Sequence, residues 1–265
     1  MTLVITADDL GLSPGVTRGV LESHRAGIVR SASLLVTFPA AEEAATLARA
    51  EPDLEVGIHL DLVGGWPASD PSAVPSLCDE NGRFYTLATF TRRLLTGRIR
   101  AAEIASELRA QVARARSWGS PATAWDSHRH THLMPPVARV VARLAGELGA
   151  RWVRRGRAPR LRRAMRPTVL HAASLVSDLV YRGIPGNTWY VDLTTHHPRL
   201  DAAGVALLAA YGGLGEISAH PGYIDRELRG SDTLVHQREH DLAVLTDPLV
   251  RTAVGHDGVV WRVRS

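Results

Sequence analysis

Short apolar segments alternate with longer amphipathic segments along most of this chain. The first apolar segment, residues 3–7, is rich in β-branched side chains, and the breaker Gly11 follows it closely. A segment of this kind is typical of a buried strand. Further strands are predicted at 32–37, 54–62, 123–128, 151–154, 188–193, 215–220 and 258–263, and helices at 14–26, 39–50, 86–117, 136–148, 168–183, 201–210 and 234–246.

The alternation of strands and helices predicts an α/β fold built on a parallel sheet, either closed into a barrel or open and doubly wound. Of the 265 residues, 45% are hydrophobic, which is enough for a single large core. We therefore expect one domain over residues 1–265, without internal repeats. Residues 63–85 are rich in Pro and Gly and form a long loop, which we expect to carry substrate contacts.

Two adjacent carboxylates, Asp8 and Asp9, follow the first predicted strand. Successive side chains on a strand point to opposite faces, so the two carboxylates should diverge and take different roles. Carboxylates at the end of a buried strand need a cation or hydrogen-bond donors nearby. The pair therefore indicates either a functional site or caps for the helix that begins near Pro14.

Histidines occupy two later segments. In residues 54–62 the apolar side chains share one face, while Gly57, His59 and Asp61 share the other, which indicates a strand that lines a site. A lone histidine there would usually only satisfy a hydrogen bond. Residues 126–132 add three histidines spaced two apart, which share one face if the strand continues, or two of which share a face if a helical turn intervenes. Either geometry can place imidazoles on a metal ion.

Six segments in order make the chain similar to a known family: residues 7–13, 27–34, 57–62, 126–132, 219–225 and 238–248. The chain resembles the YdjC-like carbohydrate deacetylases, which include the chitooligosaccharide deacetylases. The resemblance runs from about residue 3 to about residue 262. It departs at Leu10, where an aromatic residue is commoner, and is loose over the arginine-rich residues 151–166.

The resemblance implies a (β/α) barrel, which is distorted or has fewer than eight repeats. It implies removal of N-acetyl groups from an amino sugar or a short oligosaccharide, with one divalent metal ion held by Asp9, His59 and His128. One carboxylate and two imidazoles suit zinc, while magnesium, cobalt and nickel stay open. These residues are expected at the carboxyl ends of the strands, where barrel sites assemble.

The resemblance also implies catalytic roles. Asp8 would be the general base that accepts a proton from the attacking water, and His220 would protonate the departing amine. Arg154 would orient Asp8, with Arg155 as the alternative because the local match is loose. Three more residues are expected near the substrate. His130 and His132 would either contact it or support the site, and Asp61 would contact it.

Other function classes fit the residues less well. A glycosidase needs two carboxylates roughly 5–9.5 Å apart on either side of the glycosidic bond, and adjacent aspartates fit that poorly. A metal-dependent phosphoesterase stays open, as does a non-catalytic sugar-binding protein with a structural metal. The latter gives no reason for a second carboxylate beside the ligands. The identity of the sugar and the presence of a homodimer stay open as well.

The amino-acid composition limits the chemistry and the cellular location that we expect. All 31 basic residues are arginine, which excludes lysine nucleophiles and Schiff bases. The single cysteine, Cys78, cannot form an intrachain disulfide, and no apolar run reaches the length of a membrane span. We expect a cytoplasmic protein without membrane or nucleic-acid partners. Residues 151–166 are expected to form a solvated loop or helix face, with a nucleic-acid patch and anionic substrate contacts as the alternatives. The remaining histidines are expected on the surface: His171, His196, His197, His236, His240 and His256.

Overall fold

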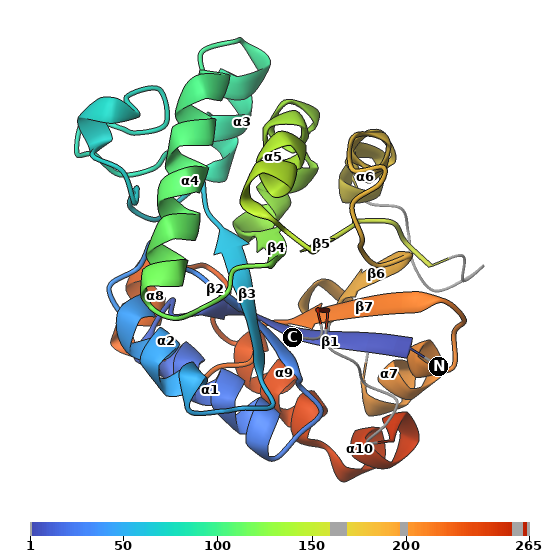
Figure 1. Cartoon of the computed structure of the whole chain (residues 1–265). Coiled ribbons are helices and arrows are strands. Elements are labelled where there is room, and N and C mark those ends of the chain that lie inside the picture. The colour runs from blue at the N-terminus through green and yellow to red at the C-terminus, as the bar shows by residue number, and fades with distance from the viewer. Residues whose placement is uncertain (1, 160–168, 197–200, 256–261, 264–265) are drawn as a thin grey trace.

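The computed structural model describes residues 2–159, 169–196, 201–255 and 262–263. Its described part contains one curled sheet of seven parallel strands with helices packed around it (Figure 1). The order across the sheet is β5-β4-β3-β2-β1-β7-β6. The strands are β1 (Thr2–Leu10), β2 (Ser31–Leu34), β3 (Glu55–Leu60), β4 (Ala124–Ser127), β5 (Trp152–Val153), β6 (Trp189–Asp192) and β7 (Leu214–Ala219).

The two edges of this sheet approach each other. The amide of Val153, on β5, donates a hydrogen bond of 2.9 Å to the carbonyl of Pro185, which lies just before β6. The amide of Tyr190, on β6, donates one of 2.7 Å to the carbonyl of Arg157. The sheet therefore curls into a barrel-like shape with seven described strands, and the prediction of a (β/α) barrel with fewer than eight repeats is confirmed.

The helices begin and end where local chemistry favours it. Ser13 caps the first helix by accepting a hydrogen bond from the amide of Val16, and the left-handed Gly149 ends the fifth. No helix among the described residues is long and apolar enough to cross a membrane. The helices are α1 (Pro14–Arg25), α2 (Ala41–Arg49), α3 (Leu87–Leu95), α4 (Ala101–Ser117), α5 (Pro135–Leu148), α6 (Val169–Val180), α7 (Ala202–Ala209), α8 (Arg226–Ser231), α9 (Gln237–Thr246) and α10 (Pro248–Val254).

The sequence pattern differs from the structure mainly near the carboxyl terminus. Helices α8 and α10 were not predicted, because they are only six and seven residues long and show little periodicity. Most of the strand predicted at 258–263 lies outside the described residues, and the described pair 262–263 forms a bend.

The interior of the barrel is polar. Thr6 on β1 donates a hydrogen bond of 2.9 Å to Glu216 on β7, and Ser33 on β2 donates one of 2.5 Å to Asp126 on β4. All four residues are fully buried. Most apolar side chains of the strands belong instead to the large core shared with the helices, and a small separate cluster of Val4, Ala124 and Trp152 lies near the beginnings of the strands.

Candidate metal centre and active site

The end of β1 brings both adjacent carboxylates to one place. Asp9 has a left-handed backbone with φ of 64°, and the pairing with β2 shifts its register between Ala7 and Leu10. As a result, an oxygen of Asp8 and an oxygen of Asp9 each lie within 4.8 Å of a nitrogen of His59. The prediction that the two side chains diverge is wrong, because this bulge breaks the alternation of the strand. A non-glycine residue in this conformation is strained, and such strain is concentrated at functional sites.

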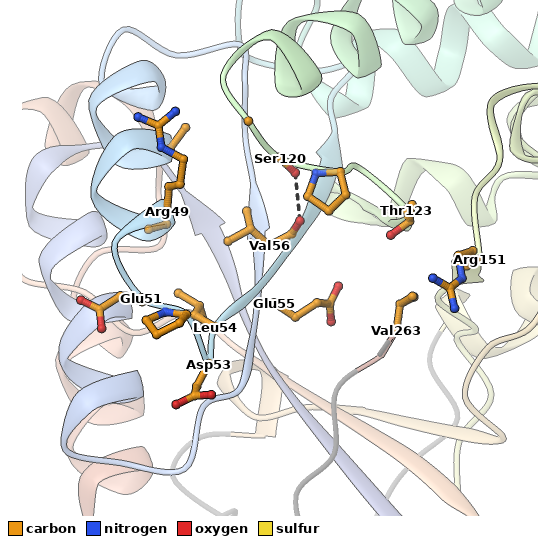
Figure 2. A pocket seen from close by; sticks show the side chains of 15 residues that line it. Arg49, Glu51, Asp53, Leu54, Glu55, Val56, Ser120, Thr123, Arg151 and Val263 are labelled. Carbon is orange, nitrogen blue, oxygen red and sulfur yellow. Dashed lines mark hydrogen bonds between the residues drawn. The ribbon is translucent and has the colours of Figure 1, made fainter. Parts of the chain in front are cut away.

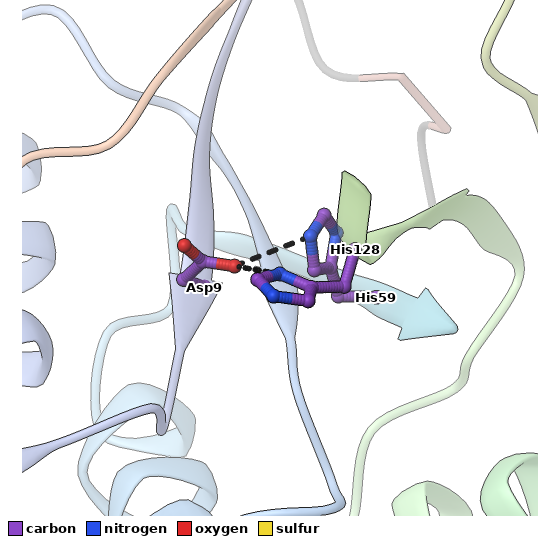
Figure 3. Close-up of side chains that lie close together, drawn as sticks. All are labelled: Asp9, His59 and His128. Atoms are coloured by element: carbon purple, nitrogen blue, oxygen red, sulfur yellow. Dashed lines mark hydrogen bonds and ion pairs between the residues drawn. The ribbon is translucent and has the colours of Figure 1, made fainter. Parts of the chain in front are cut away.

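Asp9, His59 and His128 converge on one point (Figure 3). Oδ1 of Asp9 lies 3.3 Å from Nε2 of His59 and 3.0 Å from Nδ1 of His128. All three side chains are buried. Arg238, on α9, donates a hydrogen bond of 2.7 Å to the other oxygen of Asp9, so only Oδ1 faces the imidazoles. The predicted ligand residues are thus adjacent, in an arrangement that could hold a divalent cation.

The second nitrogen of His59 is also occupied. Its Nδ1 lies 2.7 Å from Oδ1 of Asp126, on the neighbouring strand β4. Burial lowers the pKa of His59, but the carboxylates of Asp126, Asp8 and Asp9 outweigh it and raise the pKa to about 10. In the metal-free protein this ring is therefore protonated on both nitrogens. A metal ion would replace the hydrogen on Nε2, while Nδ1 continues to donate to Asp126, as is usual for histidine ligands.

A second group of possible ligands, Asp8, His59 and Asp126, is less suitable. Arg154 donates hydrogen bonds of 2.6 and 2.8 Å to the two oxygens of Asp8, and its Nη2 lies 2.9 Å from Asp126. Burial lowers the pKa of Arg154, but the carboxylates of Asp126, Asp8 and Glu216 raise it well above its usual value. A permanent cation already neutralises these carboxylates, so Asp9, His59 and His128 are the more suitable group for a metal ion.

The choice between the two candidate arginines is decided by these contacts. Arg154 is fully buried and pairs with Asp8, whereas Arg155 donates to the backbone carbonyls of Tyr181 and Ile184. The interpretation of residues 151–166 as a solvated face is therefore wrong for Arg154. The part of that segment from residue 160 onward lies outside the described residues.

The three histidines after β4 enter three different environments. A tight turn spans His128–Leu133, and Arg129 and His130 have left-handed φ values of 54° and 55°. Neither an extended strand nor a regular helical turn is formed, so neither predicted grouping of the imidazoles occurs. His128 faces Asp9, as described above.

The other two histidines of this turn lie apart from the metal ligands. His130 lies with Nε2 3.4 Å from the hydroxyl of Tyr190 and 3.8 Å from Oδ2 of Asp192. His132 is buried, 2.6 Å from the hydroxyl of Ser127 and 3.2 Å from the carbonyl of Arg154. His132 therefore supports the backbone that carries Arg154.

A cleft of about 480 Å³ opens over the site. It is lined by Asp8, Asp9, His59, His128, His130, Asp192 and His220, together with Leu87 and residues of the turns that surround them. His132 and Asp61 are not among the described residues that line it, and neither is any residue of the loop 63–85. Asp61 is buried, and its carboxylate accepts hydrogen bonds from the hydroxyl of Thr37 and from the amide of Val63, at the start of the loop.

His220 lies beyond the end of β7 in a small hydrogen-bonded chain. Its Nδ1 is 2.7 Å from the hydroxyl of Thr194, which in turn donates to the carboxylate of Asp241. Asp241 also accepts a hydrogen bond of 2.8 Å from the amide of His220. With the one hydrogen of the threonine hydroxyl given to Asp241, the hydroxyl accepts the hydrogen that Nδ1 of His220 carries. The other ring nitrogen, Nε2, is not engaged by Thr194 or Asp241.

Several residues of the site were given no role by the sequence analysis. Asp126 and Arg238 lie within segments that carry the family resemblance, and that position was the available signal for both. Glu216 is a charged residue within a strand of small and apolar residues, which is also a signal. Asp192 and Thr194 carry no comparable signal, because only the fold places them beside His220.

The other histidines were expected on the surface. His236 is exposed, as predicted, whereas His240 on α9 is only partly exposed. The side chains of His171, His196, His197 and His256 lie outside the described part of the structure.

The chain is similar to several known proteins. The sequence model described as YdjC-like protein matches residues 2–255. A carbohydrate deacetylase of Geobacillus stearothermophilus is 38% identical over 97% of this chain and 94% of its own length. A chitooligosaccharide deacetylase of Salmonella typhimurium is 33% identical over 97% of this chain and 95% of its own. Among solved structures, a protein of Enterococcus faecalis V583 described as a candidate cellobiose-phosphate cleavage protein matches with a TM-score of 0.82 and 26% identity, over 98% of this chain and 95% of its own.

Proposed function

This chain belongs to the family of YdjC-like proteins, and we propose that it is a metal-dependent carbohydrate deacetylase. Its substrate would be an N-acetylated amino sugar or a short oligosaccharide of the chitooligosaccharide type. The observation that carries the proposal is the convergence of Asp9, His59 and His128 beside a further carboxylate, Asp8, in one cleft. Relatives named as carbohydrate and chitooligosaccharide deacetylases support the choice of reaction.

The residues of the centre fit a divalent cation. One carboxylate oxygen and two imidazole nitrogens lie within 4.8 Å of one another and are buried, which matches the ligand set of zinc sites. We favour zinc, with cobalt, nickel and magnesium as alternatives. When bound, the cation would polarise the acetyl carbonyl and make water a better nucleophile.

Asp8 is proposed as the general base. Asp9, not Asp8, makes the close contacts to the imidazoles of His59 and His128. Arg154 instead donates hydrogen bonds to both oxygens of Asp8. Each of those oxygens keeps a further lone pair, so Asp8 can still accept a proton from the attacking water. The guanidinium fixes the carboxylate plane, and general-base catalysis depends on such positioning.

His220 is proposed as the general acid. In its protonated form both ring nitrogens carry hydrogens, and Thr194 retains the one on Nδ1. The proton on Nε2 is then the one delivered to the departing amine. Because an amine is a poor leaving group, this proton transfer allows the tetrahedral intermediate to collapse towards products.

His130 and Asp192 are proposed to contact the sugar. Both line the cleft, where an imidazole and a carboxylate can hydrogen-bond to sugar hydroxyls. Asp61 and His132 are buried away from the cleft lining, so we do not assign them to the substrate.

The candidate alternative is cleavage of a phosphate ester, which the name of the Enterococcus faecalis protein suggests for that protein. Acetate release and phosphate release distinguish the two reactions. Purified protein should be stripped with a chelator, loaded with zinc and assayed on diacetylchitobiose and on a phosphorylated disaccharide. We expect metal-dependent acetate release and no phosphate release.

Substitution tests the assignment of the ligands. Asp9→Asn should lose both bound zinc and acetate release, whereas the control Asp70→Asn, at an exposed turn, should keep both. Acetate release that persists after metal analysis shows the protein to be metal-free would refute the metalloenzyme. Phosphate release without acetate release would refute the deacetylase.

A further inference from the structure

The described carboxyl-terminal pair, Arg262 and Val263, lies at the floor of the barrel, opposite the cleft. Val263 packs against a small apolar cluster of Val4, Ala124 and Trp152, which are near the beginnings of their strands. The cleft lies at the other end, where Asp9 and His128 follow the strand ends. In Figure 1 this dark-red segment is drawn among the strands.

The floor also holds a pocket that is separate from the cleft. It measures about 640 Å³, and Glu55, Thr123, Arg151 and Val263 are among the residues that line it (Figure 2). Glu55, Thr123 and Arg151 lie at or just before the first residues of β3, β4 and β5. No cluster of possible metal ligands among the described residues lies there. This pocket therefore lies on the side of the barrel where Val263 is placed.

Arg262 extends from this floor into the polar interior, and only 5% of it is exposed. Its Nη1 donates hydrogen bonds of 2.7 Å to Oδ2 of Asp126 and 3.0 Å to the hydroxyl of Ser33. Its Nη2 donates one of 2.8 Å to the carbonyl of Ala32, and its Nε one of 3.2 Å to Glu55. The guanidinium is thus fixed by contacts to three neighbouring strands.

The sequence of β3 leaves room for this guanidinium. A Cβ atom at position 57 would lie 2.5 Å from Nη2 of Arg262 and 2.5 Å from the carbonyl oxygen of Ala124. Gly57, which the strand pattern placed on the same face as His59, therefore provides the space through which Arg262 reaches Asp126.

These contacts connect the carboxyl-terminal segment to the metal ligands. Asp126 uses Oδ2 for Arg262 and Oδ1 for Nδ1 of His59. The side chain of Arg262 is therefore separated from a proposed ligand by one carboxylate. Ligand histidines depend on such carboxylates for the orientation of the ring.

We propose that Arg262 is a positioning residue for the metal centre, which fixes Asp126 in the orientation that directs Nε2 of His59 toward Asp9 and His128. The inference rests on the metal site of the proposed function. Arg262 lies beyond residues 2–255, so the match to the family does not assign it. In this role, a segment at the floor of the barrel sets the affinity of a site at its opposite end.

The test measures zinc affinity rather than activity. Apo protein is titrated with zinc against a competing chelator, at a temperature well below unfolding, for wild type, Arg262→Met, Asp126→Asn and the double variant. Loss of a partner behind a metal ligand typically weakens metal binding about 10–100-fold, and we expect about tenfold for Arg262→Met. In the Asp126→Asn background the same substitution should cause no further loss, because Arg262 acts through Asp126.

A control separates this role from simple stabilisation of the fold. Truncation after Val263 retains Arg262 and should bind zinc as the full chain does, whereas truncation after Trp261 should behave like Arg262→Met. If Arg262→Met does not fold, Arg262→Lys replaces it in the same set of single and double variants. Lysine keeps the positive charge but cannot donate to Asp126 and to the carbonyl of Ala32 at the same time.

Two results would overturn the inference. One is zinc affinity in Arg262→Met equal to that of the wild type, even with a lowered melting temperature. The other is a loss of zinc affinity on Arg262→Met that is equally large in the wild-type and in the Asp126→Asn background. Failure of the wild type itself to bind zinc would instead refute the metal site of the proposed function.

Discussion

Removing the guanidinium of Arg154 should be one of the most damaging single changes in this protein. Arg154 is fully buried and lies within 2.9 Å of three buried carboxylates, Asp8, Asp126 and Glu216. Arg154→Met keeps much of the side-chain volume but leaves these carboxylates without their shared cation. Removing one partner of a buried ion pair costs about 3–5 kcal/mol.

That magnitude is large compared with the stability of a typical domain, about 5–15 kcal/mol. Part of the loss should be recovered on acidification. Burial already raises the pKa of the Glu216 carboxyl in the folded state, and without the opposing charge of Arg154 this pKa should rise further above its value in the unfolded chain. A group with a raised folded pKa destabilises the protein as pH rises through that pKa, so the difference between Arg154→Met and wild type should narrow as pH falls.

The assay is equilibrium denaturation in urea of the metal-free proteins at pH 7.5 and pH 5.5. Arg155→Met is the matched control, because Arg155 is adjacent in sequence but bonds only to backbone carbonyls and packs over Tyr181. It should cost less than Arg154→Met and show no such pH dependence. A loss for Arg154→Met below about 1 kcal/mol, the range of exposed ion pairs, would refute the reasoning. A loss that is equal at both pH values would refute its electrostatic part.

Four further predictions concern single positions or pH. Asp8→Asn should retain stoichiometric zinc but lose about 10²–10⁴-fold in rate, the usual contribution of a general base; loss of zinc would instead make Asp8 a ligand. His220→Ala should slow hydrolysis of an N-acetyl sugar severely but spare an activated aryl acetate, whose phenolate leaves without a proton; equal losses would contradict the role of acid. Gly57→Ala should destabilise the fold by about 1–3 kcal/mol through overpacking against Ala124 and Arg262, and unchanged urea denaturation would count against the close approach. Because the folded pKa of His59 is raised from 6.5 to about 10, metal-free protein should lose stability progressively as pH rises from about 6.5 to about 10, a loss that should be absent if His59 were neutral in the fold.

The sequence by itself indicated the alternation of strands and helices and the residues of the proposed metal centre. Strand periodicity is local, so the apolar segments around Ile5 and Ile58 identified their strands without knowledge of the fold. Asp9, His59 and His128 were predicted as ligands because the resemblance to the YdjC-like family, carried by motifs at three strand ends, implies that role for them. The carboxyl ends of parallel strands meet at one end of a barrel, which is why such residues come together.

Only the tertiary structure decided how the carboxylates are held. The bulge at Asp9 departs from the two-residue period, and no local pattern encodes that both Asp8 and Asp9 face one centre. The choice of Arg154 over Arg155 depends on a contact across 146 positions of the chain. Arg262 meets Asp126 across 136 positions, and nothing near residue 262 in the sequence indicates a buried guanidinium. Ionic contacts within a barrel depend on which side chains point inward from distant strands, and packing of the whole sheet sets that orientation.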